Sequence, residues 1–347
     1  MPPPILLDPA VPPLGGVFAL EQPGTGGMKA FWDIRADLAW EDATSALAAL
    51  VRHLTPGVVW FPGYICSTIL AAVPAARRRF YRLNAALDPD SDGLANVSAG
   101  DIVLAVNLFG RAPGPGWRRF VLDRPDITFV EDCAQALDTG QSPWGDWRLF
   151  SPRKLFGVPD GGLLVPVSAR ARQSGLRGPE LRSDPRIAAR HRAPMQLRRD
   201  EPFNNTLWHL RHQAAERSRV VSARTMDQEA MALLTSLDPA PMRAMRIANF
   251  SCLAERLAAF ALLPDRVPTY APMGFPVMLR PERRDEVLAA LHVARIFAAV
   301  HWRDIPAPAH FLTDHARAAS LITLPCDHRY GLPEMATIAA SFLAACR

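Results

Sequence analysis

Lysine is almost missing from this chain of 347 residues, which has only Lys29 and Lys154 among its 39 basic residues. The other 37 are arginine. A genome rich in G and C, whose codons favour arginine, accounts for most of this bias. Arginine cannot replace lysine where a buried amine must lose its proton and attack a carbonyl. The two remaining lysines are therefore the first candidates for chemistry.

Cysteine and long apolar runs are also scarce. The cysteines are five in number, scattered, and contain no C-x-x-C pair, so we expect neither a disulfide framework nor a metal site. No run of about 18 uncharged apolar residues occurs, so we expect no membrane partner. The opening letters MPPPILLDPAVPPLGG lack the basic and apolar regions of a signal peptide, which predicts a cytoplasmic protein. The cysteines are Cys66, Cys133, Cys252, Cys326 and Cys346.

The composition is that of a globular protein, with 49% apolar and 21% charged residues. It excludes a disordered or fibrous chain. The net charge of +5 is modest for this length and gives no reason to expect nucleic acid as a partner. At about 150 residues per domain, the length predicts about two domains.

Short apolar runs alternate with helical patterns in the first half of the chain. Such alternation predicts an α/β fold with a mainly parallel sheet, whose ligands lie beyond the carboxyl ends of the strands. The predicted strands, buried on both faces, are residues 58–61, 102–106, 127–130 and 163–165, and the predicted helices are residues 42–54 and 67–76.

The second half begins with a change of character. Residues 168–201 contain nine arginines and little apolar periodicity, so we interpret them as a solvated, partly mobile connection or, alternatively, as a surface facing an anion. We predict a large domain over residues 15–235 and a smaller C-terminal α+β domain over residues 236–347. Beyond residue 201 we expect helices at 227–236, 241–263, 284–293 and 333–346, and strands at 275–279, 296–300 and 321–324.

The segment from residue 127 to residue 165 combines several features of a cofactor site. Its first strand runs into Asp132, which places a carboxylate at the ligand edge of the sheet. Lys154 follows in a loop between Pro152 and Pro159. A lysine that forms a Schiff base and an aspartate that keeps a ring nitrogen protonated are what pyridoxal phosphate requires. Each residue alone is common, so the pair by itself is weak evidence.

The letters around these two residues resemble the DegT/DnrJ/StrS family of aminotransferases, a fold-type-I group that mostly makes amino sugars on nucleotide carriers. The sequence VEDCAQA at 130–136 is similar to the family motif (I/V)-E-D-x-A-Q-A. The run FSPRKLFG at 150–157, followed by DGG at 160–162, is similar to F-x-P-x-K-x-x-G and D-G-G. The resemblance implies a fold-type-I pyridoxal-phosphate transferase with a large and a small domain.

The resemblance also implies roles for single residues. Lys154 is implied as the Schiff-base lysine and proton carrier, Asp132 as the partner of the ring nitrogen, and Gln135 as a neighbour of the ring hydroxyl. The sequence ATSAL at 43–47 resembles the family's G-T-x-A-L turn. Ala43 and Thr44 would then receive the cofactor phosphate at a helix start, where backbone N–H groups favour anions.

Two further segments resemble the family more weakly. The letters PGYIC at 62–66 stand where the family has a stretch beside the cofactor, which makes Tyr64 and Cys66 candidates. Asn205 falls where family members place a loop that reaches the neighbouring subunit's cofactor phosphate, so a homodimer is expected. His301 and Trp302 follow a predicted strand and are candidates for the pocket wall.

Three departures from the family pattern fall at positions that contact the cofactor. The turn glycine is Ala43, whose β-carbon restricts the approach of a phosphate. The serine five residues before the lysine is Leu149, and Ser151 is the candidate to take over its role. The aromatic residue that stacks on the ring is replaced by Cys66, with Tyr64 nearby.

The implied function is transfer of an amino group, with pyridoxal phosphate as cofactor, from an amino acid to a keto-sugar. The resemblance implies glutamate as the donor and a nucleotide-linked sugar as the acceptor. The three departures leave an alternative, namely a non-catalytic relative that binds the cofactor or a sugar nucleotide as a regulatory or assembly partner. The lysine, the aspartate and Gln135 argue against that alternative, because a non-catalytic protein has no chemical need for them.

Overall fold

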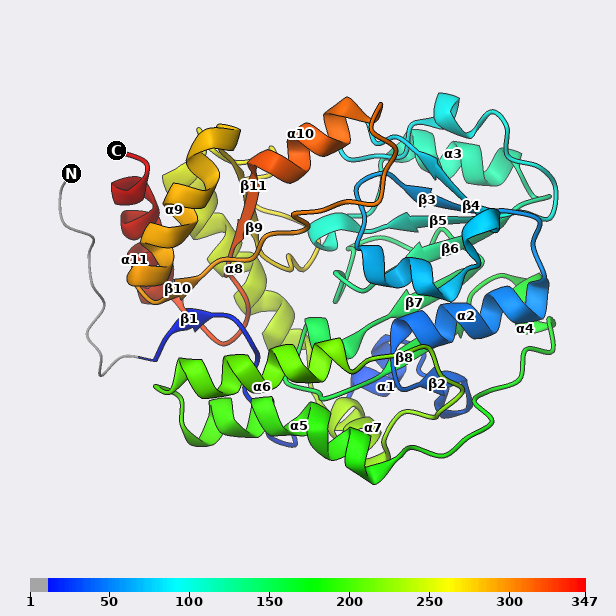
Figure 1. Ribbon diagram of the computed structural model, residues 1–347, viewed down its shortest axis with the longest axis horizontal. Coiled ribbons are helices and arrows are strands. Elements are labelled where there is room, and N and C mark those ends of the chain that lie inside the picture. The colour runs from blue at the N-terminus through cyan, green and yellow to red at the C-terminus, as the bar shows by residue number, and fades with distance from the viewer. Residues whose placement is uncertain (1–11) are drawn as a thin grey trace.

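A computed structural model describes residues 12–347 of the chain. Residues 1–11, which carry most of the segment behind the signal-peptide prediction, lie outside the described residues. A seven-stranded sheet of order β2-β8-β7-β6-β5-β3-β4 forms the centre of the larger part of the molecule (Figure 1). Its strands are β2 (Ala39–Trp40), β3 (Val59–Pro62), β4 (Arg78–Tyr81), β5 (Ile102–Val106), β6 (Thr128–Asp132), β7 (Trp147–Phe150) and β8 (Gly162–Pro166).

The sheet is mainly parallel, as predicted. Strands β3 to β7 pair in parallel, and only β8 runs antiparallel to its two neighbours, β7 and β2. All five residues of β5 are buried, because both faces of this central strand are covered. The register pairs Val106 of β5 with Asp132 of β6, so the two strands end at the same edge of the sheet.

Helix α2 (Ala43–Leu54) packs on the sheet against β7 and β8. Asp42 is its N-cap, and the Asp42 carboxylate accepts a hydrogen bond of 2.8 Å from the backbone N–H of Ser45. Its C-cap, Thr55, has a left-handed backbone with φ of 46°, which ends the helix. The cap therefore fixes where α2 begins, at the ligand edge of the sheet.

The prediction of a helix over residues 67–76 was wrong. Residues Ser67–Ala72 form a 3₁₀ helix, and the chain then leaves helical geometry at Val73. Pro74 explains the early end, because proline disfavours helical geometry in the residue before it. The predicted strand at 296–300 is likewise shorter, since only Ile296–Phe297 pairs, as β10, with β1 (Leu14–Gly15).

Residues 168–201, interpreted as a solvated connection or a surface facing an anion, contain a long helix that the sequence analysis did not predict. Helix α5 (Pro185–Asp200) occupies the second half of this stretch and packs along α6 (Asn205–Arg217). Arg198 is only 6% exposed, and its guanidinium lies 4.4 Å from the ring centre of Trp208. The carbon stem of an arginine can cover apolar surface, so this helix buries a face that shows little apolar periodicity in the sequence.

The C-terminal part contains a second, two-stranded sheet of β9 (Phe275–Met278) and β11 (Leu321–Leu324). Helix α8 (Pro239–Leu257) runs from this part toward the large sheet (Figure 1). Buried Arg246 of α8 donates 2.7 Å to the Leu155 carbonyl oxygen, beside Lys154. The remaining helices are α1 (Met28–Phe31), α3 (Pro115–Asp123), α4 (Ala169–Arg172), α7 (Gln228–Ser236), α9 (Pro281–Val293), α10 (Leu312–Ser320) and α11 (Leu332–Ala345).

Within residues 12–347, no helix combines the length and the apolar character that crossing a lipid bilayer would require. The same residues contain no group of three or more histidine, cysteine or acidic side chains placed to hold a metal ion.

Candidate functional site

A cavity of about 150 Å³ lies at the carboxyl ends of β5 and β6, between the start of α2 and the end of α6. This is the edge at which a parallel sheet binds ligands. The cavity brings together seven of the nine predicted site residues from four separate segments of the chain. These are Ala43, Thr44, Cys66, Asp132, Gln135, Ser151 and Lys154.

Asp132 is the last residue of β6 and is only 6% exposed. Its Oδ1 accepts a hydrogen bond of 2.8 Å from the backbone N–H of Ala134. Burial raises the pKa of the Asp132 carboxyl, and the positive charge of Lys154 opposes that rise. The two side chains are thus close enough to act on each other across the cavity.

Lys154 ends a short 3₁₀ turn, Pro152–Lys154, that follows β7. Its backbone N–H donates to the Ser151 carbonyl oxygen at 3.1 Å. The turn thus places Lys154 close to the edge at which the parallel strands end. Gln135 also lines the cavity, and its side-chain oxygen accepts a hydrogen bond of 2.7 Å from the backbone N–H of Phe109. We refer to Asp132, Gln135 and Lys154 as the lysine end of the cavity.

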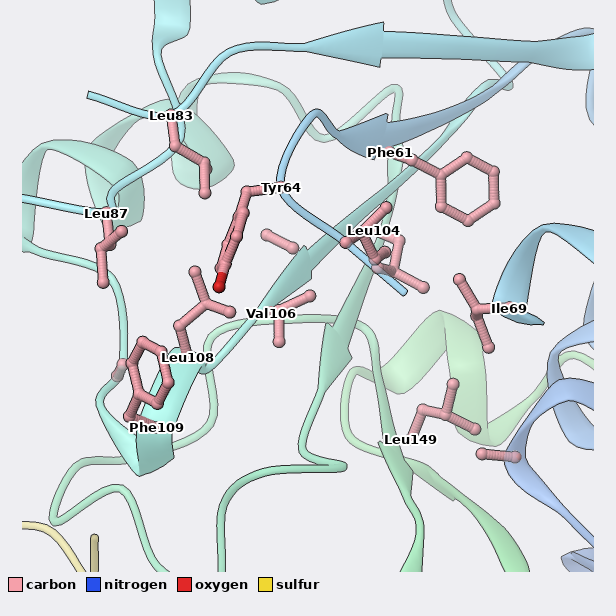
Figure 2. Packing of buried hydrophobic residues seen from close by; sticks show 14 of the residues in the cluster. Phe61, Tyr64, Ile69, Leu83, Leu87, Leu104, Val106, Leu108, Phe109 and Leu149 are labelled. Atoms are coloured by element: carbon pink, nitrogen blue, oxygen red, sulfur yellow. The ribbon is translucent and has the colours of Figure 1, made fainter. Parts of the chain in front are cut away.

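Tyr64 does not line the cavity. Its side chain is fully buried, and Figure 2 shows the ring among apolar side chains that include Leu83, Leu87 and Leu108. The Tyr64 hydroxyl has no hydrogen-bond partner among residues 12–347. The position of Tyr64 therefore does not support its prediction as a cofactor contact. Cys66, two residues further along the chain, lines the cavity instead.

Leu149, at the position of the family's serine, is fully buried in the apolar cluster drawn in Figure 2. Ser151, its predicted substitute, lines the cavity. Asn205 does not line this chain's own cavity. It is the first residue of α6, whereas Glu216, near the end of the same helix, lines the cavity. Eleven residues of helix separate the two by about 16 Å. The prediction that Asn205 reaches a neighbouring subunit is thus left open.

One aromatic side chain of the C-terminal part, that of Trp302, lines the cavity, and its neighbour His301 is not among the lining residues. Trp302 thus lies in the pocket wall as proposed, and its ring centre lies 5.2 Å from that of Tyr64. The neighbouring His301 lies 3.0 Å, through Nδ1, from the Thr323 hydroxyl oxygen. Burial, with a further contribution from the charge of Lys154, lowers the pKa of His301 to about 4. The imidazole is therefore neutral at neutral pH.

Besides Asp42, the N-cap of α2, sequence reasoning missed three charged residues of the cavity wall, which are Arg153, Glu216 and Arg219. Arg153 Nη1 lies 2.9 Å and Arg219 Nε lies 3.0 Å from the same oxygen, Oε1 of Glu216. We refer to these three residues as the arginine end of the cavity. Only the position of Arg153 next to Lys154 could have drawn attention to it. No motif marks the other two.

The side chains present fit pyridoxal phosphate. A buried carboxylate at the end of β6 suits a protonated ring nitrogen, and a lysine stands across the cavity from it. The first turn of α2, with Ala43 and Thr44 in the cavity wall, supplies backbone N–H groups that favour a phosphate. The lysine and the anion-binding groups thus lie in one cavity.

Several solved structures that are similar to this chain are described as aminotransferases. Spr1654 from Streptococcus pneumoniae, a proposed sugar aminotransferase solved in its PLP form, is 17% identical over 96% of this chain and 93% of its own, with a TM-score of 0.65. A DegT DnrJ EryC1 StrS aminotransferase from Brucella abortus is 15% identical over 92% and 88%, with a TM-score of 0.64. The chain has the fold of these aminotransferases. It is the fold-type-I architecture that the sequence predicts.

A third similar structure is DesI, solved in the presence of its TDP-sugar product. It is 21% identical over 92% of this chain and 83% of its own, with a TM-score of 0.62. No family model and no curated protein matches the chain by sequence. The similarity that these comparisons show is therefore one of fold.

Proposed function

We propose that this protein is a pyridoxal-phosphate-dependent aminotransferase that moves an amino group from an amino acid to a keto-sugar. The observation that carries the proposal is the meeting of Lys154, Asp132 and Gln135 in one cavity at the ligand edge of the sheet. The fold shared with sugar aminotransferases supports it. The same cavity would serve both halves of the reaction.

Each residue of the lysine end has a role in this reaction. The Lys154 amine would hold the cofactor covalently and, once released, carry a proton to and from the substrate carbon. Asp132 would keep the ring nitrogen protonated, because a buried carboxylate favours an adjacent positive charge. Gln135, held by the Phe109 backbone, would orient the ring hydroxyl. The bound cofactor supplies an electron sink for the carbanion that forms at the substrate carbon.

The substrates follow from the resemblance and from the comparisons. We propose glutamate as the amino donor and a nucleotide-linked keto-sugar as the acceptor, since DesI was solved with a TDP-sugar product. We also propose a homodimer, in which Asn205 of one copy approaches the cavity of the other. Trp302 would form the wall of the sugar pocket, because an aromatic face packs well against a sugar ring.

A non-catalytic role remains the second candidate, and two observations favour it. Leu149 is buried in the core and offers no hydroxyl to a phosphate. Ala43 brings a β-carbon into the cavity wall. A protein of this kind would bind a sugar nucleotide or the cofactor as a regulatory partner without transferring an amino group.

The decisive experiment is an absorbance spectrum of the purified protein with pyridoxal phosphate, before and after borohydride reduction. We expect a visible band that borohydride converts into a stable adduct on the peptide containing Lys154. The only other lysine, Lys29, is exposed in α1 and provides an internal control for non-specific reaction. Amino transfer from glutamate to a nucleotide-linked keto-sugar then tests the substrates. Absence of the band at saturating cofactor would favour the non-catalytic role.

A further inference from the structure

The arginine end of the cavity holds more hydrogen-bond donors than acceptors. Arg153 and Arg219 share one carboxylate oxygen of Glu216, and the Nη2 of Arg219 donates to the Pro159 carbonyl oxygen at 3.2 Å. Arg153 Nε and Arg219 Nη1 are buried and have no partner among residues 12–347. Burying a donor without a partner is costly, so a further acceptor that reached these donors would stabilise the cluster.

Behind the two arginines lies His191 of α5, which is 4% exposed. Neither of its ring nitrogens has a hydrogen-bond partner among the described residues. Burial, together with the charges of Arg219 and Arg153, lowers the pKa of His191 to about 3, so the ring is neutral. The charged groups of the cluster are thus two guanidinium groups and one carboxylate. Within these three residues the guanidinium groups exceed the carboxylate by one positive charge, and Asp42 in the same cavity wall is a second negative charge beside them.

The start of α2 cannot supply the whole anion site. Asp42 caps the helix with its own carboxylate, whose Oδ1 accepts from the backbone N–H of Ser45. A phosphate placed at the backbone N–H groups of Ala43 and Thr44 would therefore have a negative charge as its neighbour. Countercharge has to come from elsewhere in the cavity wall, and Arg153 and Arg219 are the groups in position to provide it.

We propose that Arg153 and Arg219 bind a phosphate group in this cavity, with Glu216 holding the two guanidinium groups in place. The proposal rests on the proposed function for the source of that phosphate, which we take to be the cofactor. The arginines would then replace the hydroxyl that Leu149 lacks and offset the effects of Asp42 and Ala43. A diphosphate of a nucleotide-linked substrate has the same chemistry and is the other possible source.

The test compares pyridoxal phosphate with pyridoxal, which lacks only the phosphate. Affinity for each is measured by titrating the visible band of the Lys154 adduct in the unaltered protein, in Arg153→Gln and in Arg219→Gln. We expect each variant to bind pyridoxal phosphate about 10- to 100-fold more weakly, because a charge-assisted hydrogen bond is lost. Affinity for pyridoxal should stay within about threefold.

Arg217→Gln is the matched control. Arg217 lies on the same helix, next to Glu216, but is exposed and does not line the cavity. It should leave both affinities unchanged. Arg219→Lys keeps the charge and should restore part of the affinity for pyridoxal phosphate, which a merely structural role would not predict. Equal loss of affinity for both ligands, or no loss for either combined with unchanged affinity for thymidine diphosphate, would overturn the proposal.

Two further measurements ask which molecule supplies the phosphate and whether the arginines bind phosphate at all. Thymidine diphosphate, measured by calorimetry against thymidine, tests the substrate source. If the arginine variants bind thymidine diphosphate more weakly while their affinity for pyridoxal phosphate is unchanged, the arginines bind the phosphate of the substrate rather than that of the cofactor. The second measurement is the effect of inorganic phosphate on the melting temperature of the protein. It does not depend on the formation of an adduct at Lys154.

The inorganic phosphate arm keeps the two proposals distinguishable. If the unaltered protein forms no adduct with either aldehyde, the proposed function fails. Stabilisation by phosphate that disappears in Arg153→Gln and Arg219→Gln would still support the arginine site. Stabilisation that is the same in the variants, or missing from the unaltered protein, would overturn it.

Discussion

The two ends of the cavity are built in different ways. The lysine end comes from one stretch of about two dozen residues, in which β6 ends at Asp132 and the turn after β7 ends at Lys154. The arginine end joins that same turn to the last residues of α6 and the loop after it, more than 60 positions further along the chain. The lysine end is therefore local in sequence, and the arginine end is not.

The difference suits the two proposals, in which the lysine end matches the family motif while the residues that bind the phosphate differ from those of the family. The backbone of a parallel sheet dictates where Asp132 and Lys154 stand, so their spacing is visible as a motif. Arg219 depends on where α6 and the loop after it place this residue, beside Glu216 and the Pro159 carbonyl, and that placement leaves no short motif. Four predictions test this contrast between the two ends.

The largest effect is expected at the lysine end. Lys154→Ala should lower amino transfer by at least about 10⁴-fold, because both the covalent link and the proton carrier are lost. Steady-state assays with glutamate and a keto-sugar would measure it. Lys29→Ala is the control and should leave the rate unchanged, since Lys29 is exposed and far from the cavity wall. Activity retained in Lys154→Ala would contradict the assignment.

Asp160 lies behind the arginine end and tests its electrostatics. Asp160 is 3% exposed, and its Oδ1 has no hydrogen-bond partner among residues 12–347. Burial raises the pKa of this carboxyl to about 7; the hydrogen bond from the Asp227 backbone N–H and the charge of Arg219 oppose the rise, and the charges of Asp227 and Glu41 add to it. The folded protein therefore keeps a proton that the unfolded chain loses from about pH 4 upward.

This proton makes the free energy of unfolding fall as the pH rises from about 4 to about 7, by up to about 4 kcal/mol. Asp160→Asn should remove that fall, because the amide imitates the protonated carboxyl. The variant would be more stable than the unaltered protein at pH 8, and the difference would shrink toward pH 5. Urea unfolding at several pH values measures it. A difference that does not vary with pH would refute the raised pKa.

Two neighbouring acids of β6 allow a paired test. Asp132→Asn should lower amino transfer by about 10²-fold or more, through loss of the charge beside the ring nitrogen, with little change in stability. Glu131 alternates to the other face of the strand and accepts hydrogen bonds from the Asn107 amide and the Trp144 backbone. Glu131→Gln should instead cost about 1–3 kcal/mol of unfolding free energy. Interchanged effects would mean that the roles of the two acids are reversed.

The smallest effect is expected at Tyr64, which belongs to neither end. Its hydroxyl is buried without a partner among the described residues. Tyr64→Phe should therefore raise the free energy of unfolding by about 1 kcal/mol. Affinity for pyridoxal phosphate should stay within about twofold, in contrast to the arginine variants. A marked fall in that affinity would restore the original prediction that Tyr64 contacts the cofactor.

Most of the large sheet could be predicted from the sequence. The runs at 102–106 and 127–130 are apolar because strands covered on both faces leave no room for polar side chains, and they became β5 and β6. β2, β4 and β7 were missed: β2 has only two residues, and Arg78, Arg79 and Arg148 interrupt the apolar character of β4 and β7. Helix α5 was missed for the same reason, because arginine stems form part of its buried face.

The local motif predicted which residues form the lysine end and the chemistry proposed for them, since the end of a strand and the turn that follows the next strand leave their residues at fixed separations in the sequence. The tertiary structure alone decided that Tyr64 turns into the core while Cys66 reaches the cavity. It also decided that Glu216 and Arg219 join Arg153 in the cavity wall. Contacts between distant segments depend on the packing of whole helices, and a pattern of neighbouring residues does not record that packing.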